Sequence, residues 1–276
     1  MKRACVIGWP IEHSRSPLIH GYWLRTLGIE GTYTREPVAP ENLAEFLANL
    51  SARGLAGCNV TVPHKEAALK LAAETDAAAR AIGAANTLWL ENGTLCASNT
   101  DAYGFMTYLG RKAPQWKKRD APVVILGAGG AARAIVHGFL EAGVRRVRIF
   151  NRSRGRSEEL AQHFGSSLEV GDWGEREAGI RDATVLVNTT TLGMKGAGDP
   201  GIDFSKVHRD LIVSDIVYVP LETAFLAAAR RQGLATVDGL GMLLHQAVPG
   251  FEKWFGVRPD VTDVLYDLVR ADIEGP

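Results

Sequence analysis

The stretch PVVILGAGGAARA, residues 122–134, decides the fold of this chain. Its apolar run is typical of a buried strand, and the GAGGAA that follows opens a helical pattern. Gly127 permits a tight turn, Gly129 lets a pyrophosphate approach the backbone, and Ala132 lets the helix pack closely on the strand. This context favours a dinucleotide-binding turn over a glycine-rich turn of an unrelated α/β protein. The residues expected at the phosphates are Gly127, Ala128, Gly129, Gly130 and Ala131.

The next predicted strand, RRVRIFNR, ends where an enzyme that uses NAD would usually carry an acidic residue for the ribose 2′-hydroxyl. No Asp or Glu stands there. Arg152, with Arg156 one turn further on, can instead pair with the 2′-phosphate of NADP through charge-assisted hydrogen bonds. The other interpretation is a solvated basic edge, because further arginines crowd the same stretch. We expect NADP rather than NAD.

Strand-like and helical runs alternate on both sides of this turn. The downstream series runs through SSLEVGDW, ATVLVNTT and LIVSDIVY to ATVDG, and it outlines a doubly wound, Rossmann-type domain. The upstream series runs through ACVIGW, GTYTREPV and GCNVTVP with helices between, in the order βαβαβ, which implies a mostly parallel sheet. Ser16 before Pro17 is a helix-start pattern, with Ser16 as a possible cap, and Asn92-Gly93 predicts a hairpin.

The polar segment RKAPQWKKRDAP, with two prolines, marks a boundary between these series. We therefore expect an α/β fold in three parts. An N-terminal α/β domain takes residues 1–102, a Rossmann-type nucleotide-binding domain takes residues 103–236, and C-terminal helices over residues 237–276 pack back on the first domain.

Composition excludes several classes of function for this chain of 276 residues. Lys plus Arg and Asp plus Glu each total 31, so no overall field attracts nucleic acid or an acidic membrane. The three cysteines are widely spaced, as in a reducing compartment, and the first apolar run is too brief for a signal peptide or membrane span. We expect a cytoplasmic protein. The spacing of His13, His64 and His245 supports neither a zinc site nor a triad, so no metal is expected.

Hydride transfer from an alcohol carbon requires a group that takes the hydroxyl proton and contacts that orient the carbon. Lys65 follows the predicted strand GCNVTVP at the start of a helix, and Asp101 begins another helix. The two residues can serve as such a pair. Taken alone, Lys65 would be an ordinary surface lysine and Asp101 a helix cap.

These residues belong to a set of motifs in which the chain closely resembles the shikimate dehydrogenase family along essentially its whole length. The motifs are IGWPIEHSRSPLIH, GCNVTVPHKE, GAANTL, NTDAYGF, GAGGAARA, NRS, NTTTLGM, DIVYVP and DGLGMLLHQA. The resemblance implies an N-terminal substrate domain, an NADP-binding domain, and reversible NADP-dependent reduction of 3-dehydroshikimate to shikimate on the route to aromatic amino acids. As partners we expect this small substrate, no nucleic acid and no membrane, with the chain a monomer or a homodimer.

The resemblance also implies roles for individual residues. Lys65 and Asp101 form the catalytic pair, with Lys65 the proton carrier. The substrate carboxylate and hydroxyls would be held by Ser14, Ser16, Asn59, Thr61, Asn86, Tyr218 and Gln246, beside Lys65 and Asp101. The adenosine end of the cofactor would meet Asn151, Arg152, Ser153 and Arg156, and the nicotinamide end Thr189, Met194, Gly239 and Met242.

Duller interpretations exist for several of these residues. Ser14 and Ser16 could form only a turn and a helix cap, and Met194 and Met242 are core residues by default. Two other functions stay open. One is a quinate or quinate/shikimate dehydrogenase that uses NAD or NADP, since one ring hydroxyl is a difference that the sequence does not resolve. The other is a non-catalytic NADP-binding regulator, which predicts loss of the proton-transfer pair.

Overall fold

The computed structural model describes residues 1–275 and divides into two compact units, each built on a six-stranded sheet. The first unit takes Met1–Asp101 and Leu244–Val269. The second takes Ala102–Leu243 and the residues from Arg270 on. The chain therefore returns to the first unit after it has completed the second sheet.

The sheet of the first unit has the order β2-β1-β3-β5-β6-β4. β1 pairs in parallel with β2 and β3, and β4 in parallel with β6, whereas β5 runs antiparallel to β3 and β6. The predicted parallel βαβαβ part and the predicted hairpin are thus both present. The strands are β1 (Lys2–Gly8), β2 (Gly31–Pro37), β3 (Gly57–Val60), β4 (Glu74–Thr75), β5 (Thr87–Glu91) and β6 (Thr94–Ser98).

Two glycines shape this sheet. Asn92 and Gly93 join β5 to β6 with φ angles of 51° and 81°, and two successive positive values are what a tight type I′ hairpin requires. A Cβ on Gly57 would run into the carbonyl oxygen of Leu88 and the indole of Trp254. Only glycine lets β3 approach these two neighbours so closely.

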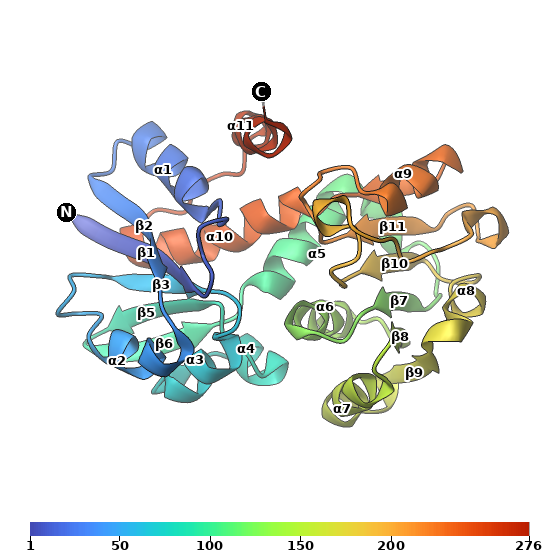
Figure 1. Ribbon diagram of the computed structural model, residues 1–276, viewed down its shortest axis with the longest axis horizontal. Coiled ribbons are helices and arrows are strands. Elements are labelled where there is room, and N and C mark those ends of the chain that lie inside the picture. Colours follow the sequence, from blue (N-terminus) through green and yellow to red (C-terminus); the bar gives the residue numbers. More distant parts are fainter. Residues whose placement is uncertain (276) are drawn as a thin grey trace. The chain divides into compact units, whose positions relative to one another are not determined.

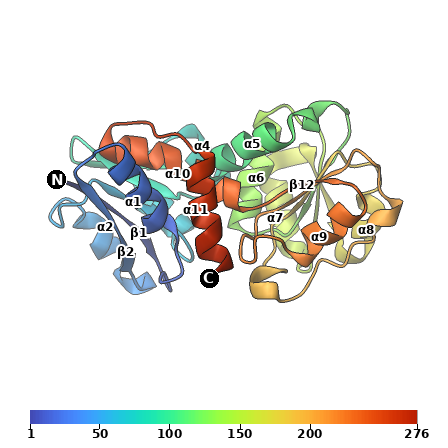
Figure 2. The same ribbon diagram turned by 90° about the horizontal axis from the view of Figure 1, so that it is seen from above.

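Helices cover both faces of the first sheet. α2, α3 and α4 lie on one face, and α1 and α10 lie on the other (Figure 1); the view from above shows α1 running beside β1 (Figure 2). Phe46 and Leu47 of α2 pack with Ile7 and Val60 of the strands in one buried core. The helices are α1 (Ser16–Thr26), α2 (Leu43–Ala48), α3 (Lys65–Leu71), α4 (Ala77–Ile82), α10 (Leu240–Phe255) and α11 (Asp263–Glu274), with a 3-10 turn at Pro40–Asn42.

The start of α1 corrects one sequence prediction. Arg15 occupies the cap position and its side chain makes no capping hydrogen bond, while Pro17 stands in the first turn as expected. Ser16 is already helical, and its hydroxyl accepts a hydrogen bond from the hydroxyl of Ser14 at 3.3 Å. The capping role predicted for Ser16 is therefore wrong, because this hydroxyl belongs to a pair of serine side chains.

The C-terminal part of the chain fills the core on the α1 face. Trp254 of α10 donates from its indole to the carbonyl of Leu88 at 2.8 Å, and Trp23 of α1 donates to the carbonyl of Asp260 at 3.0 Å. Phe251 meets Trp23 edge to face at 5.3 Å between ring centroids. These contacts tie α10 to the sheet of the first unit.

The sheet of the second unit has the order β12-β11-β10-β7-β8-β9, and all its neighbouring strands are parallel. β7 lies in the middle, so the chain builds outward from it first on one side and then on the other, as in a doubly wound fold. α6 and α7 cover one face and α8 and α9 the other (Figure 1). This order confirms the predicted Rossmann-type architecture.

The strands of the second unit are β7 (Val123–Leu126), β8 (Val147–Asn151), β9 (Leu168–Asp172), β10 (Val185–Asn188), β11 (Ile212–Asp215) and β12 (Ala235–Val237). Its α-helices are α5 (Asp101–Lys112), α6 (Gly130–Glu141), α7 (Arg154–Phe164), α8 (Arg176–Gly179) and α9 (Ala224–Arg231). Short 3-10 turns lie at Pro114–Lys117, Gly165–Ser167, Trp173–Glu175, Met194–Gly196 and Phe204–Lys206. Over residues 1–275, each helix is too short or too polar to span a membrane.

Candidate active site

The GAGGAA turn joins the end of β7 to the start of α6. Gly127 has a φ of 104°, and a Cβ there would lie 2.7 Å from the hydroxyl of Thr189, so the position demands glycine. A Cβ on Gly129 or Gly130 would meet no atom within 4 Å. The space in front of these two backbones is thus open at the amino end of a twelve-residue helix, where a pyrophosphate fits.

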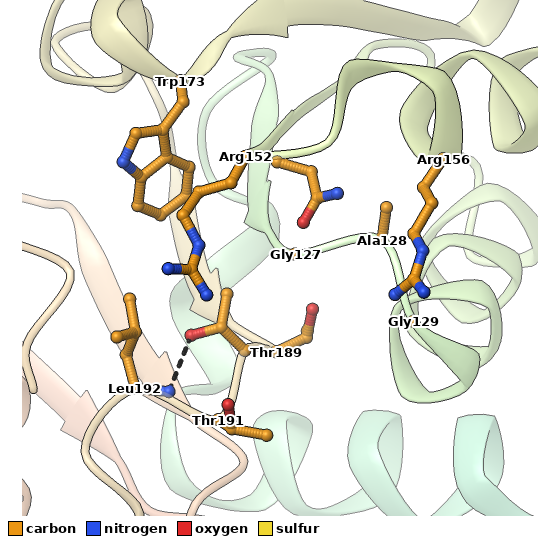
Figure 3. Close-up of a pocket in the computed structure, with 11 residues that line it drawn as sticks. Gly127, Ala128, Gly129, Arg152, Arg156, Trp173, Thr189, Thr191 and Leu192 are labelled. Atoms are coloured by element: carbon orange, nitrogen blue, oxygen red, sulfur yellow. Dashed lines mark hydrogen bonds between the residues drawn. The ribbon is translucent and has the colours of Figure 1, made fainter. Parts of the chain in front are cut away.

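A pocket of about 210 Å³ opens at this turn (Figure 3). It collects residues from the ends of β7, β8, β9 and β10, which is the edge of a parallel sheet where ligands of such folds bind. The lining residues are Gly127, Ala128, Gly129, Asn151, Arg152, Arg156, Trp173, Thr189, Thr190, Thr191 and Leu192. Seven of these were predicted at the cofactor.

The two predicted arginines differ from the other arginines of the same stretch. Arg148 pairs with Glu169 and Asp182, and Arg154 pairs with Glu158 and Asp172. In the part of the chain that the structure describes, Arg152 and Arg156 have no carboxylate partner, and both line the pocket. Figure 3 shows their guanidinium groups reaching into the pocket from different sides. A solvated basic edge does not explain this separation, whereas a phosphate ligand does.

A buried polar network fixes the wall of the pocket at Thr189. Thr189 donates from its hydroxyl to the carbonyl of Leu126 at 2.8 Å. Next to it, the amide of Asn188 donates to Asp215 and to the carbonyl of Leu192, each at 3.0 Å. Burial raises the pKa of Asp215 to about 6, although three donors oppose the shift. The loop after β10 is therefore held in place before any ligand arrives.

The remaining predicted cofactor residues lie outside the lining of this pocket. Gly130 and Ala131 continue into α6, and Ser153 caps α7 without a side-chain hydrogen bond. Met194 is 46% exposed after β10, while Met242 is buried in α10. A Cβ on Gly239 would strike the backbone of Ile216, so that glycine is explained by packing alone. Their contacts with the cofactor stay predictions.

The predicted catalytic pair is assembled in the first unit. Nζ of Lys65, at the first residue of α3, donates to Oδ2 of Asp101 at 2.5 Å, and the amide of Asn86 donates to Oδ1 at 2.8 Å. The Asp101 side chain is 8% exposed and that of Lys65 is 23% exposed. Both oxygens of the carboxylate thus accept a hydrogen bond, whereas the lysine side chain is only partly buried.

Asn86 is the hub that joins this pair to two other predicted residues. Its amide also approaches Oε1 of Gln246 at 3.4 Å, and its carbonyl oxygen accepts from the backbone and hydroxyl of Thr100 at 2.8 and 3.1 Å. The hydroxyl of Thr100 lies 2.8 Å from the carbonyl of Gln246. The network therefore connects Asn86, the residue before β5, with α5 and α10 through side chains that are nearly buried.

Asn59 on β3 is held from two sides. Its carbonyl oxygen accepts from the phenol of Tyr33 at 2.6 Å, and its amide donates to the carbonyl of Asn86 at 3.1 Å. Burial raises the pKa of Tyr33, which keeps the phenol protonated as a donor. His20 stacks on Tyr33 with 3.9 Å between ring centroids, and burial lowers the pKa of His20 to about 3. His20 is the last residue of the motif IGWPIEHSRSPLIH, whereas none of the quoted family motifs contains Tyr33.

The serines and Thr61 lie around the ends of β1 and β3. The carbonyl of Ser14 accepts two hydrogen bonds from Arg35, at 2.8 and 2.6 Å, which fixes the turn that presents its hydroxyl. Thr61 donates from its backbone to the carbonyl of Ile7 at 3.0 Å, directly after β3. Tyr218 belongs to the second unit and is half-buried.

The three histidines noted in the sequence lie in different surroundings. His64 is buried and its ring nitrogen lies 2.7 Å from the carbonyl of Val38, which is a packing role. His13 is exposed and His245 is buried in α10. Across residues 1–275 no group of three or more His, Cys, Asp or Glu side chains is arranged to hold a metal ion.

Four pocket residues escaped the sequence reasoning. Thr190, Thr191 and Leu192 belong to the motif NTTTLGM, of which only Thr189 and Met194 were selected. Trp173 follows β9, and the signal was present, since an aromatic residue directly after a predicted strand of such a sheet lies at the ligand edge.

Family comparisons agree with the two units. The models of the shikimate dehydrogenase substrate binding domain, of shikimate/quinate 5-dehydrogenase and of the shikimate 5′-dehydrogenase C-terminal domain match residues 6–88, 109–193 and 239–270. A shikimate dehydrogenase (NADP(+)) of Brucella abortus (strain S19) is 56% identical over 275 residues, 99% of this chain and 95% of that protein. The chain belongs to the shikimate dehydrogenase family.

Solved structures of the family have the same fold. Shikimate 5-dehydrogenase from Thermus thermophilus, in complex with NADP(H) and shikimate, aligns with a TM-score of 0.88 at 36% identity, over 98% of this chain and 100% of that one. Quinate dehydrogenase from Corynebacterium glutamicum, in complex with NAD, aligns with a TM-score of 0.89 at 30% identity, over 97% and 98%. The fold is thus shared by relatives that differ in substrate and cofactor.

Proposed function

We propose that this member of the family is an NADP-dependent shikimate dehydrogenase, which reversibly reduces 3-dehydroshikimate to shikimate. The observation that carries the proposal is the ion pair of Lys65 and Asp101, in a chain 56% identical to an NADP-dependent shikimate dehydrogenase over nearly its whole length. A non-catalytic regulator would have no need of this pair. The product belongs to the supply of aromatic amino acids.

NADP fits the pocket of the second unit. The open backbone at Gly129 accommodates a pyrophosphate, and Arg152 and Arg156 offer two unpaired guanidinium groups to a 2′-phosphate. When bound, NADPH supplies the hydride. The residues that would hold it are Gly127 to Ala131 at the phosphates, Asn151 to Ser153 with Arg156 at the adenosine, and Thr189, Met194, Gly239 and Met242 toward the nicotinamide.

Proton transfer falls to Lys65. In reduction, the ammonium group donates a proton to the substrate's carbonyl oxygen as the carbon receives hydride, and the amine regains a proton from water; oxidation reverses these steps. Asp101 holds Nζ in place through its hydrogen bond. Asn86 keeps the carboxylate of Asp101 oriented.

The same unit offers the polar groups for a cyclic carboxylic acid. Hydroxyls of Ser14, Ser16 and Thr61 can donate to a carboxylate or a ring hydroxyl. Amides supply the remaining contacts from the same networks that orient Asp101. The residues of this unit proposed to bind substrate in addition to the catalytic pair are Ser14, Ser16, Asn59, Thr61, Asn86 and Gln246. Tyr218 is the residue proposed for this role from the second unit.

Roles follow for the parts of the chain. Residues 1–102 would form the substrate domain, residues 103–236 the NADP-binding domain, and residues 237–276 helices that belong with the substrate domain. The enzyme would act in the cytoplasm as a monomer or homodimer, and its three cysteines are free and buried, as expected of a reducing compartment. Light scattering on the purified protein distinguishes one copy from two.

Absorbance at 340 nm tests the proposal with four mixtures that combine shikimate or quinate with NADP or NAD. We expect the highest kcat/KM for shikimate with NADP. A higher kcat/KM for quinate than for shikimate, or for NAD than for NADP, would indicate a quinate or quinate/shikimate dehydrogenase. Binding of NADP without turnover of either acid would make it a regulator.

A further inference from the structure

Trp173 directly follows β9, the strand next to β8, and is the aromatic residue in the pocket lining. In the parallel pairing of β8 with β9, Asn151 lies opposite Asp172. Arg152 and Trp173 therefore directly follow two adjacent strands, and both line the pocket. Figure 3 shows the side chain of Arg152 running alongside the indole.

We infer that Trp173 forms the adenine-binding surface of the cofactor pocket and that its indole, next to the guanidinium of Arg152, stacks on the base. This inference rests on the proposed use of NADP. Nothing else among the eleven lining residues offers an aromatic face; the others are glycines, threonines, arginines, an alanine, an asparagine and a leucine.

The chemistry of the ligand places the base at this wall. In NADP the 2′-phosphate and the adenine are attached to neighbouring carbons of one ribose. A site that holds the phosphate with Arg152 and Arg156 must therefore receive the base close by. Trp173 is the neighbouring group with a broad apolar face, and stacking between a base and an aromatic side chain needs only two flat faces.

The indole is held in position by Arg176. The guanidinium carbon of Arg176 lies 4.7 Å from the ring centroid of Trp173, and its Nη1 donates to the carbonyl of Trp173 at 2.8 Å. The same guanidinium donates to the carbonyls of Pro200 and Gly201 at 3.0 and 3.2 Å. With its donors used in this way, Arg176 restricts the rotation of the ring. A pre-ordered ring loses little entropy when a ligand binds.

A purely structural role for Trp173 makes a different prediction. The indole also packs against the core that contains Phe150. If it served only that core, a leucine at this position would replace it well, and ligand affinity would follow overall stability. If it stacks on the base, an aromatic ring is required and leucine does not suffice.

Direct binding of adenosine 2′,5′-bisphosphate tests the inference, because this fragment carries the base and the 2′-phosphate but has no nicotinamide and supports no turnover. Isothermal titration calorimetry on the full chain gives the Kd. We expect Trp173→Ala and Trp173→Leu to weaken binding by about tenfold to a hundredfold, and Trp173→Phe to restore most of it. Trp89→Ala is the matched control, since Trp89 also lies under a cation, Lys253 at 4.5 Å, but in the first unit. It should bind as the wild type does.

A second measurement separates the base from the phosphate. Because NAD and NADP share adenine, Trp173→Leu should weaken both cofactors by the same factor and leave their ratio of Kd values unchanged. Arg156→Ala should change that ratio. Fragment binding by Trp173→Leu within twofold of that of Trp173→Phe would overturn the inference. Adenosine bisphosphate binding does not depend on which alcohol is oxidised, so failure of the shikimate assay and failure of this test are distinct results.

Discussion

Asp101 receives Nζ of Lys65 on one carboxylate oxygen, at 2.5 Å, and the amide of Asn86 on the other, at 2.8 Å. Both oxygens of the carboxylate are thereby occupied by donors that come from other parts of the chain, α3 and the residue that precedes β5. An ion pair that is fixed in this way orients the ammonium group, and the Lys65 side chain still keeps 23% of its surface exposed. Removal of the ammonium group should therefore affect chemistry more than folding.

Lys65→Ala should fold and bind NADP yet lose turnover by at least about a hundredfold, the usual scale for removal of a general acid or base. The loss should fall on kcat, because the proton is transferred only in the reaction. Steady-state rates at 340 nm and calorimetry with NADP provide the two readouts. Lys70→Ala, at an exposed position on the same helix, is the control and should keep full activity. Unchanged turnover in Lys65→Ala would remove Lys65 from the mechanism.

Asn86→Ala should lower stability and activity together. The substitution leaves the backbone amide of Thr100 and one oxygen of Asp101 without their partners in a buried region. Each unsatisfied buried group costs about 1 to 3 kcal/mol, so with two such groups the free energy of unfolding should drop by about 2 to 6 kcal/mol. Urea unfolding measures it, with Asn49→Ala as control because the Asn49 amide only meets an exposed carbonyl of its own helix. A loss below about 0.5 kcal/mol would contradict the role of Asn86 as hub.

Local rules were enough for the parts of the fold that depend on neighbours in sequence. The positive φ at Gly127 and the hairpin at Asn92-Gly93 were predictable because each is a requirement of a short backbone segment. Ser16 shows the limit of such rules. Its sequence context suits a helix cap, but its hydroxyl accepts a hydrogen bond from the hydroxyl of Ser14 instead of from a backbone amide of the helix. Residue types alone do not predict which of these two donors is chosen.

Site residues were predictable to the extent that motifs mark them. Lys65 and Asp101 are 36 residues apart, and only the fold brings them within 2.5 Å. Their pairing was expected from chemistry and from family resemblance. Tyr33, which holds Asn59, and Trp173, which lines the pocket, lie outside the quoted motifs. Aromatic residues in or beside strands are most often core, so residue type alone does not separate these two from the rest, and only the position of Trp173 after its strand marks it.

His20 should make the protein sensitive to acid. The ring is fully buried, neither nitrogen has a hydrogen-bond partner among the described residues, and burial lowers its pKa to about 3. The ordinary value near 6.5 applies in the unfolded chain, so the unfolded state binds a proton first. The stability that neutral His20 contributes is complete above pH 6.5 and is lost as the pH falls toward 3, by up to about 1.4 kcal/mol per pH unit.

His20→Phe keeps an aromatic ring in the stack with Tyr33 and removes the titration. The unfolding free energy of the wild type minus that of the variant should decrease as the pH is lowered from 7 to 5. Urea unfolding at pH 7, 6 and 5 gives this slope, which is independent of any constant cost of the larger ring. His13→Phe, at an exposed histidine, should give a flat difference. Parallel curves for wild type and His20→Phe would show that His20 is protonated as easily in the fold as in the unfolded chain.

Asp215 should act in the opposite sense. Burial raises its pKa to about 6, above the ordinary value of 3.8, so the folded state binds the proton more tightly than the unfolded chain. The stabilising contribution of the protonated acid is complete below about pH 3.8 and is lost as the pH rises through 6, which amounts to about 3 kcal/mol.

Asp215→Asn keeps an oxygen for the amide of Asn188 and the backbone of Val217. The stability of wild type relative to this variant should therefore fall between pH 4.5 and 6 and level off above pH 6.5. Unfolding in urea at four pH values checks this, with Asp210→Asn at the surface as control; a relative stability that rises with pH would mean that the three donors around Asp215 outweigh its burial.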